Sequence, residues 1–340
     1  MTNANRAIQN ESRVQRLRSE ILPVLPKRLS DAIGKAGDAI LQSLEEIRLR
    51  ADLPLMLQNY RGDLLVGEDG KTGILPGNAL VVSREDILRA VELMSENSIY
   101  AYQEEIRSGY ITIRGGHRVG IAGKAVVEGC SVRNIKEISG LNIRLSSQVV
   151  GCSSKVLKYI IHGRTGVYNT LVISPPQCGK TTILRDMARA LSNGIDELAF
   201  KGVKVGVVDE RSEIAACFKG AAQNDLGIRT DVLDGCPKAI GLPMIIRSMS
   251  PQVVITDEIG NEGDREAIMG VLNAGVCIIA SAHGCNITEL KSRREVLRLM
   301  EEKVFERYVV LSSDRGPGTV AEVVDGATMK PLIGEDAYGF

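Results

Sequence analysis

Leu171-Val-Ile-Ser-Pro-Pro-Gln-Cys-Gly-Lys-Thr-Thr182 is an apolar run that leads through a short loop into the start of a helical pattern. A buried strand followed by a loop, Gly-Lys-Thr and a helix is the context that the P-loop pattern requires. Backbone N–H groups of such a loop point toward phosphates, and the helix dipole favours their negative charge. The segment therefore predicts a nucleotide site at one edge of an α/β sheet.

The predicted nucleotide-binding residues are those of the loop and the first helical turn: Ser174, Pro175, Pro176, Gln177, Cys178, Gly179, Lys180, Thr181 and Thr182. We expect Lys180 to reach the β- and γ-phosphates of ATP and the Thr181 hydroxyl to bind Mg²⁺. Ser174 departs from the pattern, because a glycine usually stands there. The two prolines lack N–H groups, so the phosphate contacts must come from Cys178 onward.

Cys178 lies beside a helix N-terminus and Lys180, two features that favour a reactive thiol. We expect alkylation of Cys178 to block ATP binding. The alternative is that Cys178 is a small residue that only fills space.

Two apolar strands farther along the chain end in carboxylates. The run 253–258 has the Walker B form, in which Asp257 would hold Mg²⁺ through water and Glu258 would polarise the attacking water. The run 205–211 ends in the same way and would open onto the same sheet edge. Glu210 is therefore an alternative to Glu258, which we favour, and Arg211 would pair with Glu210 or reach across a subunit interface.

A third apolar run, 278–284, ends in polar residues at the same predicted edge. Either Ser281 or His283 would sense the γ-phosphate there. The elements predicted beyond the junction are 170–174, 181–191, 203–209, 242–249, 253–257, 262–272, 276–281 and 287–304. Apolar strands alternating with helices favour a RecA-like P-loop NTPase domain over residues 146–340, with a mostly parallel sheet.

Residues 1–145 predict a smaller α+β domain. The first twenty residues are polar and favour a frayed helix or tail, and glycines up to Gly77 mark a turn-rich segment. Ser83 and Asp86 form a capping-box pattern before a helix, with Ile87, Val91 and Met94 on one face and Leu88 beside them. A hairpin is expected to turn at 115–116 between strands 110–114 and 119–127, and 135–145 predicts another strand pair.

The composition is that of an ordinary globular protein. The 340 residues are 44% hydrophobic and 25% charged, and the formal net charge is zero, so we expect no nucleic-acid partner. The seven cysteines have no C-x-x-C spacing and predict reduced thiols in a cytoplasmic protein. The sequence shows neither a signal peptide nor an apolar run of about 18 residues, the length of a spanning helix.

Several segments resemble known families. Three segments resemble those of the secretion-type ATPases of type II and type IV secretion and type IV pili. They are an acidic segment, Asp209-Glu-Arg211, an Arg-Pro segment, Arg247–Gln252, and a histidine segment, Ala280-Ser-Ala-His283. Over nearly the whole chain, four segments resemble the stage III sporulation protein AA family, in which serine is usual at position 174: Ser108–Gly123, Ile138–Leu145, Ser174–Thr182 and Val208–Ile214.

This second resemblance implies a hexameric homo-oligomer that uses ATP and Mg²⁺ on the mother-cell side of the forespore envelope. It would energise a secretion-like channel built from membrane proteins of sporulation. The resemblance also implies that the first domain brings arginines toward the phosphates, with Arg114, Arg118 and Arg144 as candidates. Arginine fingers contribute about 10³–10⁵ in rate where they are used, whereas the alternative is that these arginines pair with surface acids.

Three other functions compete with this motor. A nucleic-acid-dependent P-loop ATPase needs basic and aromatic surface, and only 4% of the residues are aromatic. An assembly scaffold would bind ATP with little turnover, although both Glu210 and Glu258 are present. A small-molecule kinase would need a lid over its acceptor, for which the sequence offers no segment.

Overall fold

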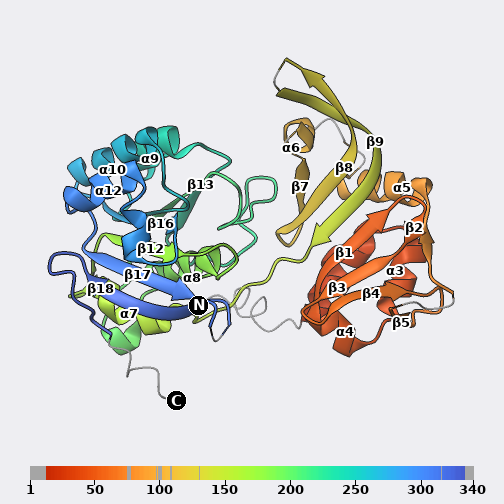
Figure 1. Cartoon of the computed structure of the whole chain (residues 1–340), viewed down its shortest axis with the longest axis horizontal. Helices are drawn as coiled ribbons and strands as arrows, with labels where there is room; N and C mark the ends of the chain where they lie inside the picture. The colour runs from red at the N-terminus through yellow and green to blue at the C-terminus, as the bar shows by residue number, and fades with distance from the viewer. Residues whose placement is uncertain are drawn as a thin grey trace. The chain divides into compact units, whose positions relative to one another are not determined.

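The computed structural model describes residues 13–74, 78–96, 98, 102–107, 109–129, 131–314 and 316–333. The first twelve residues of the predicted tail lie outside these ranges, as do Gly77, Ser108 and Cys130. The chain divides into two compact units, Met1–Ser147 and Gln148–Phe340 (Figure 1).

The N-terminal unit combines short helices with an antiparallel sheet. Its described helices are α2 (Arg13–Arg16), η1 (Leu17–Ile21), η2 (Leu22–Val24), α3 (Lys27–Gly34), α4 (Asp38–Ser43), α5 (Arg84–Met94) and α6 (Gln103–Arg107). The part of residues 1–20 that the structure describes is helical, and Val14 and Leu17 are buried, so the segment expected to be a frayed helix or tail contributes to the core. The predicted capping box is confirmed, because Ser83 and Asp86 each accept the other's backbone N–H. Leu88 is 54% exposed and does not belong to the buried face of α5.

The sheet of this unit has the strand order β5-β4-β3-β1-β9-β8-β7. Its strands are β1 (Leu44–Arg50), β3 (Met56–Asn59), β4 (Gly62–Val66), β5 (Thr72–Gly73), β7 (Tyr110–Ile113), β8 (His117–Glu128) and β9 (Ser131–Arg144), and β2 (Leu53–Pro54) pairs separately with β6 (Val81–Val82). The hairpin around Gly115 and Gly116 is confirmed. The strand pair predicted over 135–145 is wrong. Gly140 pairs with Arg50 on one side and Ala122 on the other, which keeps β9 extended through that glycine.

The C-terminal unit is built on a seven-stranded sheet with the order β14-β13-β15-β16-β12-β17-β18. Its strands are β12 (Thr170–Ser174), β13 (Val205–Asp209), β14 (Thr230–Asp234), β15 (Val253–Thr256), β16 (Cys277–His283), β17 (Arg307–Ser312) and β18 (Thr319–Asp325). All neighbouring strands are parallel except β17 and β18. The mostly parallel α/β fold is therefore confirmed. The strands β14, β17 and β18 were not predicted.

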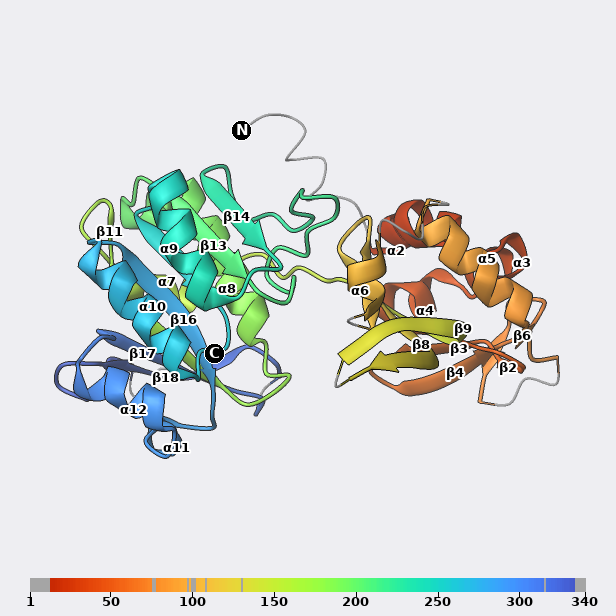
Figure 2. The ribbon, with the colours of Figure 1, turned by 90° about the horizontal axis from the view of Figure 1, so that it is seen from above.

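Helices cover both faces of this sheet (Figures 1 and 2). They are α7 (Ser154–Ile160), α8 (Lys180–Asn193), η4 (Asp196–Leu198), α9 (Lys238–Met249), α10 (Glu262–Asn273), α11 (Ile287–Leu290) and α12 (Arg294–Glu301), and β10 (Ile161–His162) pairs with β11 (Gly166–Val167). The helix predicted over 287–304 is two helices. Alternate strand residues face opposite layers: Val172 packs in one cluster with α7 and α8, and Leu171 in another with α9, α10 and α12.

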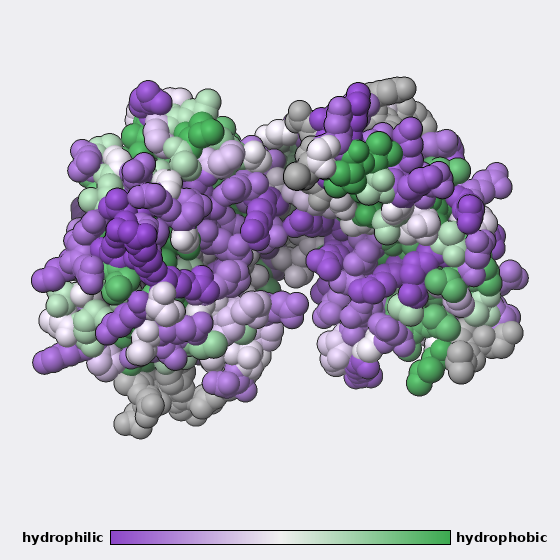
Figure 3. Space-filling model, turned by 45° about the horizontal axis from the view of Figure 1, so that its top comes forward, coloured by the Kyte–Doolittle hydropathy of each residue, from purple (hydrophilic) through white to green (hydrophobic). Residues whose placement is uncertain are grey.

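Within the described ranges, no helix is both long and apolar enough to cross a membrane. The face shown in Figure 3 is mostly hydrophilic, with apolar residues in small separate groups.

Candidate functional site

The predicted phosphate loop lies between β12 and α8. Gly179 adopts φ 83° and ψ 13° at the N-cap of α8, a left-handed conformation that favours glycine. A Cβ at Gly179 would lie 2.9 Å from the backbone nitrogen of Gly318, whose N–H donates to the Cys178 carbonyl at 2.9 Å. The loop therefore packs closely against Pro317 and Gly318, and Cys178 is only 5% exposed. The described cysteines are all free thiols.

Lys180, at the first position of α8, contacts the ends of two other strands. Its side chain is 7% exposed, and Nζ lies 3.5 Å from Oε1 of Glu258 and 3.2 Å from Nδ1 of His283. Burial lowers the pKa of Lys180, and the negative charge of Glu258 opposes this shift. Nε2 of His283 lies 2.8 Å from Oε1 of Glu258. The structure thus brings together three residues that the sequence placed on separate elements.

Glu258 is surrounded by positive charge. Besides Lys180 and His283, Arg211 contacts it, with Nη1 2.8 Å from Oε2. Burial raises the pKa of Glu258, but Lys180, Arg211 and His283 together lower it more, so it lies below its usual value. The backbone of Glu258 has φ 40°, and its N–H donates to Oγ of Ser281 at 3.1 Å. Ser281 therefore holds the Glu258 backbone, and of the two candidate sensors His283 is the one that contacts Lys180.

Asp257 fits the predicted Mg²⁺ site. It is 2% exposed, and its buried Oδ1 has no hydrogen-bond partner among the described residues. Burial raises its pKa, with Lys238 as the main opposing charge. A buried carboxylate oxygen without a partner is rare and calls for an ion or water. The Thr181 hydroxyl would supply an oxygen ligand of the kind that Mg²⁺ prefers, and Asp257 would hold the ion through water.

Glu210 points to a different partner. It pairs closely with Nζ of Lys238, the buried first residue of α9. Arg211, expected to pair with Glu210 or to reach across a subunit interface, pairs with Glu258 within the chain, and the interface role stays a prediction. Sequence reasoning missed Lys238, although Pro237 before an apolar helical run marked a helix start there.

Sequence reasoning also missed Glu213. Its negative charge acts on both Lys180 and Asp257 and raises the pKa of each, as a smaller contribution than burial. Two sequence signals could have found it: it lies four residues after Asp209, the last residue of an apolar strand, and it belongs to Val208–Ile214, one of the segments that resemble the family.

The candidate arginines lie in the N-terminal unit. The guanidinium of Arg118 stacks 3.6 Å from the ring centroid of Tyr110. Nε of Arg144 lies 3.1 Å from Oε1 of Glu46, and Arg114 is exposed in the turn after β7. Their approach to the phosphates stays a prediction.

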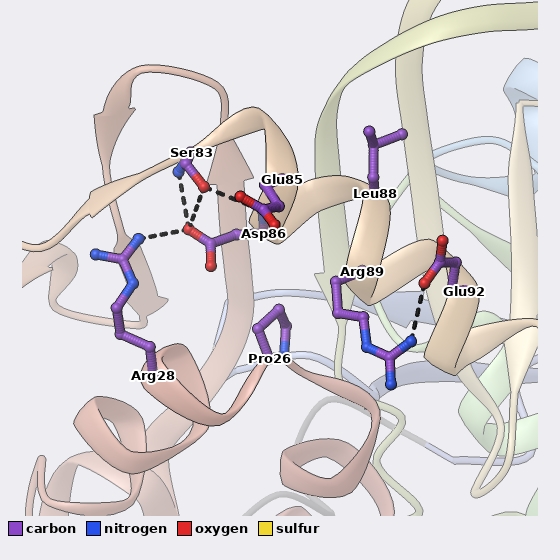
Figure 4. Close-up of a pocket in the computed structure, with 8 residues that line it drawn as sticks. All are labelled: Pro26, Arg28, Ser83, Glu85, Asp86, Leu88, Arg89 and Glu92. Carbon is purple, nitrogen blue, oxygen red and sulfur yellow. Dashed lines mark hydrogen bonds and ion pairs between the residues drawn. The ribbon is translucent and has the colours of Figure 1, made fainter.

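A separate cavity of about 580 Å³ lies beside α5 in the N-terminal unit (Figure 4). Four of its five charged residues form two pairs, Arg28 with Asp86, and Arg89 with Glu92 at 2.9 Å. Because these pairs need no ligand, we place the candidate site at the phosphate loop.

Comparisons with known proteins agree with this fold. Residues 15–330 match the family described as "Sporulation stage III, protein AA". The chain is 42% identical over 307 residues to the stage III sporulation protein AA of Bacillus subtilis (strain 168), covering 90% of this chain and 95% of that protein.

Two solved structures of secretion-type ATPases share the fold. The Legionella pneumophila ATPase DotB has a TM-score of 0.57 at 12% identity, over 89% of this chain and 81% of DotB. The pilus retraction motor PilT has a TM-score of 0.52 at 15% identity, over 86% of this chain and 77% of PilT. The C-terminal unit therefore has the RecA-like fold of these ATPases.

Proposed function

The chain belongs to the sporulation stage III protein AA family, and on that premise we propose that it is an ATP-hydrolysing motor of the secretion-ATPase type. The motor would energise the assembly of a membrane channel, or transport through it, during sporulation. Residues 146–340 would form the ATPase domain, and residues 1–145 the domain that precedes it.

The observation that carries this proposal is the meeting of Lys180, Glu258 and His283 at the N-terminus of α8. Backbone N–H groups from Cys178 to Thr182 and the Lys180 ammonium would bind the phosphates. When bound, Mg²⁺ would neutralise charge on the β- and γ-phosphates, held by the Thr181 hydroxyl directly and by Asp257 through water.

Glu258 is our candidate for orienting the attacking water. Its lowered pKa keeps the carboxylate ionised at neutral pH, so it can accept a hydrogen bond from that water. His283 contacts both Glu258 and Lys180, which suits a residue that senses the γ-phosphate. Glu210 is tied to Lys238 and becomes the second choice.

A second candidate is an ATP-binding scaffold with little turnover. One observation favours it: each oxygen of the Glu258 carboxylate contacts a cationic side chain or His283. In this arrangement these partners compete with a water for the Glu258 carboxylate, and turnover would rise on release of one of them. A membrane partner could trigger that release.

For the assembly, we propose a homo-hexamer on the mother-cell side of the forespore envelope. Membrane proteins of the channel would hold it there. These proposals extend the family resemblance.

The test is steady-state ATP hydrolysis by the purified full chain, beside Lys180→Ala and single alanine variants of Arg114, Arg118 and Arg144. Particle size would be measured with and without ATP. The proposal expects turnover that Lys180→Ala abolishes, together with ATP-promoted assembly. ATP binding and assembly without turnover would favour the scaffold, and unchanged turnover in all three arginine variants would remove the arginine fingers. Strong stimulation by single-stranded DNA or RNA would contradict the motor.

A further inference from the structure

Two buried charged residues, Asp209 and Arg185, hold the segment that follows β13 by hydrogen bonds. This segment is here called the acidic loop (residues 210–216). Glu213, Ile214 and Ala215 donate their backbone N–H groups to the Asp209 carboxylate at 2.9, 2.9 and 2.8 Å. The Arg185 guanidinium donates to the carbonyls of Ile214 and Glu213 at 2.8 and 2.7 Å. Residues 213 and 214 are thus held through both their N–H and their C=O groups.

Arg185 belongs to the helix that begins at the phosphate loop. It lies five residues after Lys180 on α8 and is 7% exposed. Burial lowers its pKa, and Asp209 is the main charge that opposes the shift. A buried cation costs free energy unless it is hydrogen-bonded and paired with a negative charge. Here the carbonyls of Glu213 and Ile214 accept its hydrogen bonds, and the Asp209 carboxylate supplies the negative charge. The contact therefore ties α8 to the acidic loop through a specific fork of donors.

The acidic loop needs such support. Ser212 and Ala216 flank the held segment with φ 53° and φ 50°, a left-handed conformation that costs free energy for residues other than glycine. The loop also carries two side chains that act on the candidate site. Arg211 pairs with Glu258, and the charge of Glu213 is felt by Lys180.

We infer that Arg185 is a positioning residue for this site. It fixes the acidic loop, and with it Arg211 and Glu213, in register with the helix that binds the phosphates. A lysine cannot replace it, because an ammonium on a flexible chain does not reproduce a planar fork on two successive carbonyls. The expected effect on turnover rests on the proposed ATPase function, whereas the contact of Arg185 with the acidic loop does not.

The test compares Arg185→Lys with Arg189→Lys in the full-length protein. Arg189 is a matched control on the same helix, where its guanidinium pairs with Asp186 and does not contact the acidic loop. We expect Arg185→Lys to lower kcat at least about tenfold while Kd for ATP stays within about threefold. We expect Arg189→Lys to leave both near the parent values.

Hydrogen exchange supplies a readout that is independent of ATP. The amides of residues 213–215 donate to Asp209, so they should exchange slowly in the parent. Arg185→Lys should speed their exchange at least about tenfold, and Arg189→Lys should not. A folded Arg185→Lys variant with parental exchange over 213–215 would overturn the inference, as would parental kcat in that variant. A parent protein without ATP turnover would refute the proposed function. The exchange data alone would still show whether Arg185 holds the acidic loop.

A milder variant covers the case in which Arg185→Lys does not fold. Asn224→Ala removes only the 3.0 Å bond from Nδ2 of Asn224 to the Ile214 carbonyl. In this variant the exchange rate of the amides of residues 213–215 should also rise, by a smaller factor than in Arg185→Lys. An unchanged exchange rate would count against the inference.

Discussion

Asp186 ties the start of the C-terminal unit to the phosphate-loop helix, and its removal should be costly. The side chain is 1% exposed and accepts the Gly151 N–H at 2.9 Å, and the N–H and hydroxyl of Ser153 at 2.8 and 2.6 Å. Arg189 pairs with it at 2.8 Å. Burial raises its pKa, but these partners lower it more, so the folded protein holds the ionised form.

Replacement of Asp186 by alanine leaves several donors without an acceptor. Ser153 is fully buried, so its two donors cannot turn to water, and each costs about 1–3 kcal/mol. With the lost ion pair, we expect a loss of about 3–5 kcal/mol in the free energy of unfolding. In a unit of this size each kcal/mol lowers Tm by about 2–4 °C, so Tm should fall by roughly 6–20 °C.

Scanning calorimetry of the full chain measures this loss, with the exposed Asp231→Ala as the control, which should shift Tm by less than about 2 °C. Only the transition of the C-terminal unit should move. Because the folded pKa of Asp186 is depressed, its stabilisation is present above the unfolded pKa and is lost as pH falls through the folded pKa. The two proteins should therefore converge at low pH. A loss under about 1 kcal/mol at pH 7 would refute the reasoning.

Three further changes test other parts of the chain. Gly179→Ala should weaken ATP binding at least about tenfold in a binding titration, because its φ of 83° and the nearby Gly318 nitrogen disfavour a Cβ. His117 should make the N-terminal unit less stable in acid. Burial lowers the pKa of His117, Glu20 raises it, and Arg16 and Arg13 lower it further. The stability that is present above the unfolded pKa is therefore lost as pH falls through the folded pKa. The Tm of His117→Gln should depend less on pH than that of the parent between about pH 7.5 and 5.5. Ser83→Ala should cost about 0.5–2 kcal/mol in urea unfolding, since it removes the N-cap acceptor of α5, whereas Ser98→Ala should not.

The elements around the phosphate loop could be predicted because local signals agree with the tertiary structure. The apolar run of β12 is buried throughout, and the helix after Gly179 begins where the P-loop pattern places it. The unpredicted strands differ among themselves. β14 is only half buried and has Asp231 and Asp234 among its five residues, which weakens any strand signal. Tyr308–Leu311 in β17 is a buried apolar run, so a usable signal was present there.

The contacts within the site could not be read from the sequence. Glu210 and Glu258 both follow apolar strands that end in an acid, and their local patterns are equivalent. The difference arises from the sheet order, in which β15 lies beside β16 and brings Glu258 to His283, while Glu210 meets Lys238 on α9. The Leu88 side chain illustrates the same limit, because its exposure depends on what packs against α5.

The central claim is that Glu258 orients the attacking water in a site built on Lys180, and the most direct measurement is the ATP turnover of Glu258→Gln against its matched control Glu210→Gln. Both variants remove one charge from a carboxylate at the end of a neighbouring strand. We predict that Glu258→Gln binds ATP as the parent does but lowers kcat at least about a hundredfold, while Glu210→Gln keeps kcat within about tenfold. A larger loss in Glu210→Gln than in Glu258→Gln, or parental turnover in Glu258→Gln, would contradict the account.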